Sequence, residues 1–307
     1  MRAFTLDSFD APPRLRDDLP EPRPAANQLV VRVLTSSVNG ADAAVAAGMV
    51  REMAEHTFPV TLGRDFAGVV EDTGAGVSGY QRGDEVFGFL PLTNPTVHEG
   101  SWAELISVPE DNSVASKPST PDMAESGAAP LTGITALAAL DALAPSAGER
   151  VLVIGAPGGV GSFFVQLAAQ ADAHVIAPAL AEDEAYLREL GASEILDRTA
   201  DLQAAIRERY PDGVDAILDL VSYTPQDALL REGGRLASPL GAAGEGSGRF
   251  NLMAQPTPQN LQRLADLLDS RALRVRIQRS YTLEQAGEAL QAFAATHTQG
   301  KLSLTIT

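Results

Sequence analysis

A glycine-rich turn between an apolar strand and an apolar helix constrains the fold of this chain more than any other feature. Residues 151–154 are typical of a buried strand, 155–161 form the turn, and 160–170 show the pattern of an apolar helix. A helix N-terminus offers free N–H groups and a partial positive charge to an anion. Gly158 lets the backbone approach a pyrophosphate, and Gly161 lets the helix pack closely on the strand. The sequence therefore predicts a dinucleotide-binding fold.

A structural turn in a cofactor-free α/β domain is the alternative explanation of these glycines. Pro157 favours it, because proline has no N–H to donate to a phosphate. At the end of the next strand, 174–180, an acid would bind the ribose 2′-hydroxyl of NAD, and a base would bind the 2′-phosphate of NADP. Neither is in register, and Glu182 and Asp183 are expected to begin the following helix. These residues leave the choice between NADPH and NADH open.

The pattern of the chain changes near residue 120. Before it, short strands with glycine-rich turns predict a small, partly open barrel, with strands at 28–34, 66–71, 84–89 and 102–108. After it, strands and helices alternate, which predicts a parallel sheet wound with helices. Its strands are expected at 150–154, 174–177, 194–196, 214–220 and 234–237, and its helices at 123–143 (interrupted near Pro130), 160–170, 181–190, 202–210 and 225–230. The tail predicts helix 258–270, strand 273–277, helix 283–294 and strand 301–306.

Composition and charge exclude several classes of function. The chain has no Cys, so disulfides, a thiol nucleophile, iron–sulfur clusters and thiolate zinc sites are excluded. Its 23 basic and 40 acidic residues give a net charge of -17, which repels nucleic acid and anionic membranes. The histidines lack the spacing of metal ligands, so no metal site is expected; they are His56, His98, His174 and His297. Without a signal peptide or a long apolar run, we expect a cytoplasmic protein.

Short motifs follow one another in an order that is specific as a set. They are SVNGAD at 37–42, LGRDFAGVV at 62–70, GDEVFG at 83–88, GSWAE at 100–104, PLTGITA at 130–136, LRELGA at 187–192, GGRL at 233–236 and GKL at 300–302. Through these motifs, almost from end to end, the chain resembles the zinc-independent medium-chain dehydrogenases/reductases of the quinone oxidoreductase branch. The resemblance implies a Rossmann domain at 119–269, inserted in a β-rich GroES-like domain of residues 1–118 and 270–307. It also implies a homodimer and an active site in the cleft between the domains.

The resemblance implies a metal-free reductase. Zinc-dependent relatives carry a Cys where this chain has Val38 and Asn39, and a His–Glu pair where it has Arg64 and Asp65. Hydride addition to a quinone or an α,β-unsaturated carbonyl spreads the negative charge, so hydrogen-bond donors and good alignment can replace a Lewis acid. The expected activity is NAD(P)H-dependent reduction of such a small molecule. The family favours NADPH, whereas Glu182 leaves NADH possible.

Site residues are carried over from the resemblance. The expected catalytic residues are Asn39, Asp42, Arg64 and Thr135. The expected cofactor-binding residues are Thr135, Gly155, Ala156, Gly158, Gly159, Val160, Gly161, Leu180, Leu220, Val221, Leu240 and Lys301. Arg64 could donate to the developing oxyanion or form a structural ion pair with Asp65, and no proton donor is assigned. Two alternatives stay open: an enoyl reductase for one biosynthetic intermediate, and a non-catalytic NADPH-binding module.

Overall fold

The computed structural model describes residues 1–53, 55–91, 96, 98–295 and 297–306. The chain forms two compact units. The β-rich unit comprises Met1–Leu131, Gln255–Arg271 and Val275–Thr307, and the parallel-sheet unit comprises Thr132–Ala254 and Ala272–Arg274. The β-rich unit thus includes 119–131 and 255–269, which the sequence suggests for the Rossmann domain. The boundaries of independently folding domains stay a prediction.

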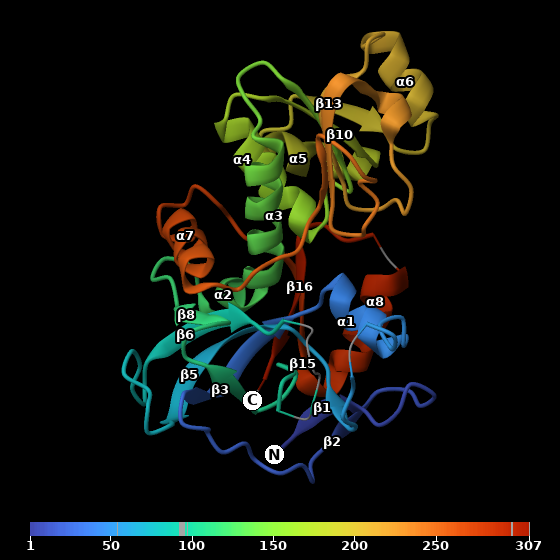
Figure 1. Cartoon of the computed structure of the whole chain (residues 1–307). Coiled ribbons are helices and arrows are strands. Elements are labelled where there is room, and N and C mark those ends of the chain that lie inside the picture. Colours follow the sequence, from blue (N-terminus) through green and yellow to red (C-terminus); the bar gives the residue numbers. More distant parts are fainter. Residues whose placement is uncertain (54, 92–95, 97, 296, 307) are drawn as a thin grey trace. The chain divides into compact units, whose positions relative to one another are not determined.

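The main sheet of the β-rich unit is built around one long strand, β3 (Gln28–Ser37). The sheet runs β15-β16-β3-β5-β6-β8, and β7 also pairs with β3. Its other strands are β5 (Asp65–Thr73), β6 (Glu85–Phe89), β7 (Leu105–Pro109), β8 (Val114–Ser116), β15 (Ile277–Thr282) and β16 (Lys301–Thr305). Strand β16 pairs antiparallel with β3, so the C-terminal strands in red lie beside the N-terminal strand in blue (Figure 1). A smaller sheet has the order β2 (Arg14–Arg16), β1 (Ala3–Leu6), β4 (Val60–Thr61).

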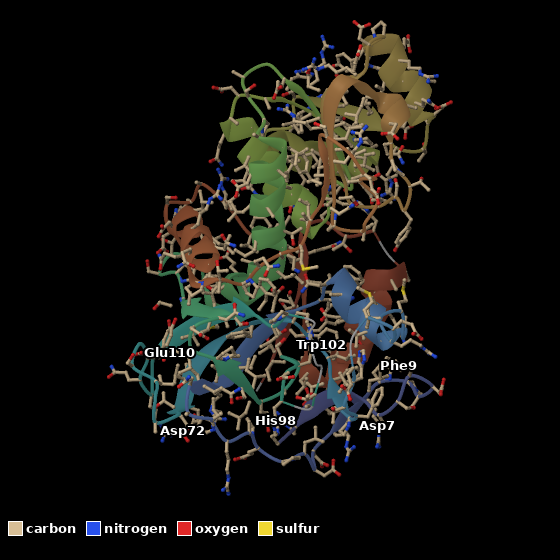
Figure 2. The ribbon with its side chains drawn as sticks, viewed as in Figure 1. Asp7, Phe9, Asp72, His98, Trp102 and Glu110 are labelled. Carbon is tan, nitrogen blue, oxygen red and sulfur yellow. The ribbon has the colours of Figure 1, made fainter. Side chains whose placement is uncertain are left out.

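Trp102 lies at the centre of the β-rich unit's core. Its side chain is fully buried among the strands (Figure 2), and its ring centroid is 6.0 Å from that of Phe4. Its indole Nε1 donates to the carbonyl of Ser37 at 3.1 Å, which satisfies the one polar atom of the side chain. The unit also holds α1 (Gly40–Ala46), α2 (Met123–Ala128), α7 (Pro258–Asp269) and α8 (Ala286–Ala295). In the part of the chain that the structure describes, every helix is too short or too polar to span a lipid bilayer.

The other unit is a parallel sheet with the order β11-β10-β9-β12-β13-β14. Its strands are β9 (Arg150–Ile154), β10 (His174–Ala179), β11 (Glu194–Asp197), β12 (Val214–Asp219), β13 (Leu230–Ser238) and β14 (Arg249–Asn251). They alternate with α3 (Pro130–Leu143), α4 (Gly159–Gln170), α5 (Glu184–Leu190) and α6 (Leu202–Arg209). In chain order this is 3-2-1-4-5-6, the Rossmann arrangement, whose order reverses between β9 and β12. The predicted fold class is confirmed.

Most predicted elements are present. The helix at 123–143, for example, is interrupted as expected, with α2 ending at Ala128 and α3 beginning at Pro130. Three predictions differ from the structure. The helix predicted at 225–230 is only a 3-10 turn, Asp227–Leu229. The strand predicted at 273–277 is wrong, because β15 begins at Ile277. There Gln166 accepts from the Arg274 N–H and donates to its carbonyl, so a side chain takes the bonds of a strand neighbour. The short strands β1, β2, β4, β8 and β14 were not predicted.

Two glycines at the start of α4 differ in the space around them: Gly158, its N-cap, and Gly161, in its first turn. A Cβ on Gly161 would lie 2.3 Å from the Gly155 carbonyl oxygen, a contact with backbone that cannot move aside. A Cβ on Gly158 would meet only that same oxygen, at 3.5 Å. We therefore expect Gly161→Ala to lower the free energy of unfolding by about 2 kcal/mol or more, measured by urea titration.

Gly158→Ser is the matched control. Gly158 is the N-cap of α4 at φ -71°, where serine is a preferred residue, so its stability should stay within about 0.5 kcal/mol of wild type. Equal stability of both variants would contradict the close helix–strand contact.

Candidate functional site

The N-terminus of α1 fixes two of the predicted catalytic residues. Asn39 is the N-cap, with extended backbone at φ -130° and ψ 162°. Asp42 lies in the first turn and its Oδ2 accepts from the Asn39 backbone N–H at 2.8 Å. An acid in a first turn also suits the helix dipole. The sequence NGAD thus holds both side chains at one end of α1.

Asp65 joins these residues to other segments of the β-rich unit. Its Oδ2 accepts from Ser37 Oγ at 2.6 Å and from Asn39 Nδ2 at 2.8 Å. Its Oδ1 accepts from the Leu131 N–H at 2.6 Å, at the start of α3. Asp65 is fully buried, so its charge requires such donors. We call Ser37, Asn39, Asp42, Arg64, Asp65 and Lys301 the buried polar cluster.

Lys301, at the start of β16, supplies a cation to the cluster. Its Nζ donates to Asn39 Oδ1 at 2.5 Å and to the Val38 carbonyl at 3.2 Å, and lies 3.5 Å from Asp65 Oδ2. Burial lowers the pKa of Lys301, and the charges of Asp65 and Asp42 oppose that effect. The structure therefore brings Lys301 together with Asn39. Its predicted contact with a cofactor stays a prediction.

Arg64 and Asp42 each have one unsatisfied polar atom. Arg64 is 2% exposed, and its guanidinium donates weakly to the carbonyls of Thr61 at 3.4 Å and Pro91 at 3.5 Å. Among the described residues, Arg64 Nε and Asp42 Oδ1 are buried without a hydrogen-bond partner. Burial lowers the pKa of Arg64, and Asp42 and Glu99 oppose it. The fold thus leaves one buried donor and one buried acceptor of these two side chains without a protein partner in the described ranges of the chain.

The electrostatics of Asp42 differ from those of Asp65. Burial raises the pKa of Asp42 to about 7, against the attraction of Arg64 and the Asn39 N–H. Asp65 adds to the rise and Lys301 opposes it. Asp42 therefore exchanges its proton near neutral pH.

The second group of predicted residues lies in the parallel-sheet unit. Gly155 follows β9 with φ 90°, and Gly158 caps α4. The first hydrogen bond of the helix runs from the Ser162 N–H to the Gly158 carbonyl at 2.9 Å. The N–H groups of residues 159–161 therefore have no acceptor within the helix. The space beside Gly158 Cα is open apart from Gly155 O at 3.5 Å. These groups fit the pyrophosphate of a dinucleotide.

The other predicted cofactor contacts follow the carboxyl ends of neighbouring strands. Leu180 comes after β10, Leu220 and Val221 after β12, and Leu240 after β13. Val221 is 58% and Leu240 38% exposed, which is unusual for large apolar side chains. In open α/β sheets ligands bind at this edge. Thr135 is buried on α3, in the same unit.

The acids after β10 are only partly available to a ribose. Asp183 is fully buried, and its Oδ2 accepts from the Leu180 N–H at 3.1 Å, at the start of the 3-10 turn Ala181–Asp183. It therefore begins the helical segment, as expected. Glu182 in the same turn is exposed.

The sequence reasoning missed three polar residues. Ser37 and Asp65 lie within quoted motifs but were not assigned to the site, and Asp219 was not considered. Asp219 ends β12, is fully buried, and its Oδ1 accepts from the Val221 and Ser222 N–H groups. An acid inside an otherwise apolar run indicates a buried carboxyl group. The run AILDLV at 216–221 gives this signal for Asp219.

The Asp42→Asn variant tests the electrostatics of the buried polar cluster. In wild type, between the ordinary pKa of 3.8 and about 7, the folded state holds a proton that the unfolded state has lost. The free energy of unfolding therefore falls as pH rises through this window. Asparagine has no such proton. The free energy of unfolding of Asp42→Asn, relative to that of wild type, should therefore rise by a few kcal/mol at most between pH 4 and pH 8. Denaturant titration measures it. Parallel curves for the two proteins would refute this prediction.

Comparisons with known proteins agree with this geometry. Residues 25–119 match the alcohol dehydrogenase GroES-like domain, and 190–304 match the zinc-binding dehydrogenase model. A chloroplast envelope quinone oxidoreductase homolog of Arabidopsis thaliana is 32% identical over 67% of this chain and 63% of its own length. The quinone oxidoreductase of Rattus norvegicus is 31% identical over 72% of this chain and 67% of its own.

The solved structures agree as well. The quinone oxidoreductase from Coxiella burnetii superposes with a TM-score of 0.88 at 27% identity, covering 100% of this chain and 99% of that one. Together with the strand order and the glycine turn, these similarities settle the family. The chain belongs to the medium-chain dehydrogenases/reductases, in their quinone oxidoreductase branch.

Proposed function

We propose that this protein uses NADPH to reduce a quinone or an α,β-unsaturated carbonyl compound, without zinc. The observation that carries the proposal is the turn at 155–161, which opens onto the N-terminus of α4 where the strand order reverses. That is where α/β proteins of this topology hold a dinucleotide. Family membership supports the same reaction class.

The parallel-sheet unit supplies the residues that would hold the cofactor. The N–H groups of Gly159, Val160 and Gly161 would bind the pyrophosphate, and the open space beside Gly158 admits it. Val221 and Leu240 offer an apolar surface to the nicotinamide ring. The reduced nicotinamide supplies the hydride. These two side chains would orient the ring.

In the β-rich unit, we assign the acceptor's oxygen to the buried polar cluster. Addition of hydride places negative charge on that oxygen, and the unsatisfied Arg64 Nε–H is a donor for it. Asn39 cannot rotate, because its amide is bonded to Asp65 on one side and Lys301 on the other. A guanidinium where zinc relatives carry a histidine cannot ligate a metal, which supports zinc independence. Asp42 of this unit and Thr135 of the parallel-sheet unit complete the proposed catalytic set.

Cofactor preference, assembly and location complete the proposal. We take NADPH as the cofactor, as the family favours, with NADH possible. Of the two acids that directly follow Ala181, Asp183 is bonded to the Leu180 N–H and Glu182 is exposed. A homodimer follows from family analogy, and the cytoplasm is the location that we propose. Light scattering of the purified protein tests the dimer.

The first test follows oxidation of NADPH and of NADH by the purified protein against a panel of quinones and enones. We expect turnover with at least one acceptor, and a larger kcat/KM with NADPH. Turnover of a single enone alone would favour a dedicated enoyl reductase. Cofactor binding without turnover of any acceptor would favour the non-catalytic module.

Gly158→Asp separates binding from folding. Aspartate is a good N-cap and the added Cβ has room, so the variant should fold and melt near the wild-type temperature. Its carboxylate would occupy the place of the pyrophosphate, so affinity for NADPH should fall at least about 100-fold, measured by quenching or enhancement of NADPH fluorescence. Gly158→Ser serves as the neutral control. Unchanged affinity in a folded Gly158→Asp protein would rule out this turn as the cofactor site.

A further inference from the structure

Asp219 carries a carboxylate oxygen that the fold does not use. The side chain is fully buried, at the carboxyl end of β12. Oδ1 accepts from the Val221 N–H at 3.0 Å and the Ser222 N–H at 2.9 Å. Within the described part of the chain, Oδ2 has no hydrogen-bond partner. Two N–H donors thus fix Oδ1, and the second oxygen remains available to a ligand.

The register places this carboxylate beside the glycine turn. Asp219 is paired with Ile154, the last residue of β9, and the Leu220 N–H donates to the Ile154 carbonyl at 3.1 Å. Gly155 follows, and a Cβ there would lie 3.1 Å from both Leu220 and Val221 side-chain atoms. Asp219 is therefore next to the point where the strand order reverses, on the β12 side.

The two halves of a dinucleotide lie on opposite sides of that point. The ribose of the adenosine half is expected at the end of β10, so the nicotinamide half extends toward β12 and β13. The exposed apolar side chains of Val221 and Leu240 follow those strands. Asp219 is thus a buried carboxyl group on the nicotinamide side of the edge.

The nicotinamide ring changes charge during the reaction. It is neutral in the reduced cofactor and positively charged in the oxidised one. A fixed negative charge nearby stabilises the oxidised form selectively, and low solvent exposure strengthens the effect. Such a charge makes the bound reduced cofactor a stronger hydride donor.

We propose that Asp219 tunes the redox balance of the bound cofactor, binding its nicotinamide riboside half through Oδ2 and favouring the oxidised over the reduced form. This inference rests on the proposed function, because it requires a nicotinamide cofactor in the parallel-sheet unit. It assigns Asp219 as a cofactor-contacting residue that sequence reasoning did not identify.

Asp219→Asn tests the proposal by equilibrium binding. The asparagine oxygen can still accept from the Val221 and Ser222 N–H groups, so the turn is kept while the charge is removed. At an effective dielectric constant of about 20, charges about 10 Å apart contribute roughly a tenfold change in affinity. We expect the Kd of NADP⁺ to rise about tenfold and the Kd of NADPH to change less than about twofold. The potential of the bound couple then rises by about 30 mV, the two-electron equivalent of a tenfold change.

Asp215→Asn is the matched control. Asp215 lies on the same strand near its other end, where it pairs with Arg231 and accepts from the Arg150 N–H. Its replacement removes the same charge from the protein far along β12, so the ratio of the two dissociation constants should stay within about twofold of wild type. An equal shift of that ratio in both variants would overturn the proposal, since net charge alone would then explain it.

The remaining outcomes are also decisive. If wild type binds both cofactor forms and Asp219→Asn leaves their Kd ratio unchanged, the redox role is wrong while the proposed function stands. If wild type binds neither NADP⁺ nor NADPH, the proposed function itself fails. Should the asparagine variant not fold, Asp219→Ser replaces it, and the same shift of the Kd ratio is expected.

Discussion

The β-rich unit depends on the hydrogen bonds and charge balance of one buried carboxylate, that of Asp65. Its hydrogen-bond donors are Ser37 at the end of β3, Asn39 just after it and Leu131 at the start of α3, and Lys301 of β16 lies 3.5 Å away. Three distant regions of the chain therefore meet at this carboxylate. A buried anion without such partners costs several kcal/mol, and so does a buried Lys301 without an anion. The two charges therefore specify one mutual arrangement of these segments. The catalytic candidate Asn39 is oriented as a consequence.

The parallel-sheet unit was the more predictable part of the fold. Its strands 150–154 and 214–219 are apolar runs bounded by turn residues, and its glycine turn has a mechanism as well as a pattern. The β-rich unit depends on pairings between distant short strands such as β1 with β4, and a two-residue strand leaves no periodic signal. The misplaced strand at 273–277 has an alternating pattern, but the Gln166 side chain takes its hydrogen bonds. Local pattern cannot report a competing partner over a hundred residues away.

The candidate site shows the same limit. Asn39 and Lys301 were both identified by resemblance, yet their direct contact spans 262 positions and no local pattern implies it. Arg64 and Asp65 are neighbours in sequence, which suggested an ion pair. In an extended segment, however, successive side chains point to opposite faces. Asp65 accordingly forms an ion pair with Lys301. Among the charged groups that raise the pKa of Arg64, Asp42 has the largest effect.

The proton of Asp42 makes the charge of the buried polar cluster variable. With Asp42 protonated, the charged side chains within the cluster are the cations Arg64 and Lys301 and the anion Asp65, a balance of two minus one, or +1. Once Asp42 ionises, near pH 7, the balance is zero. An anionic small molecule entering this part of the protein would therefore meet attraction in mildly acidic solution and none in alkaline solution. The net charge of the buried polar cluster can in this way take two values without any movement of the backbone.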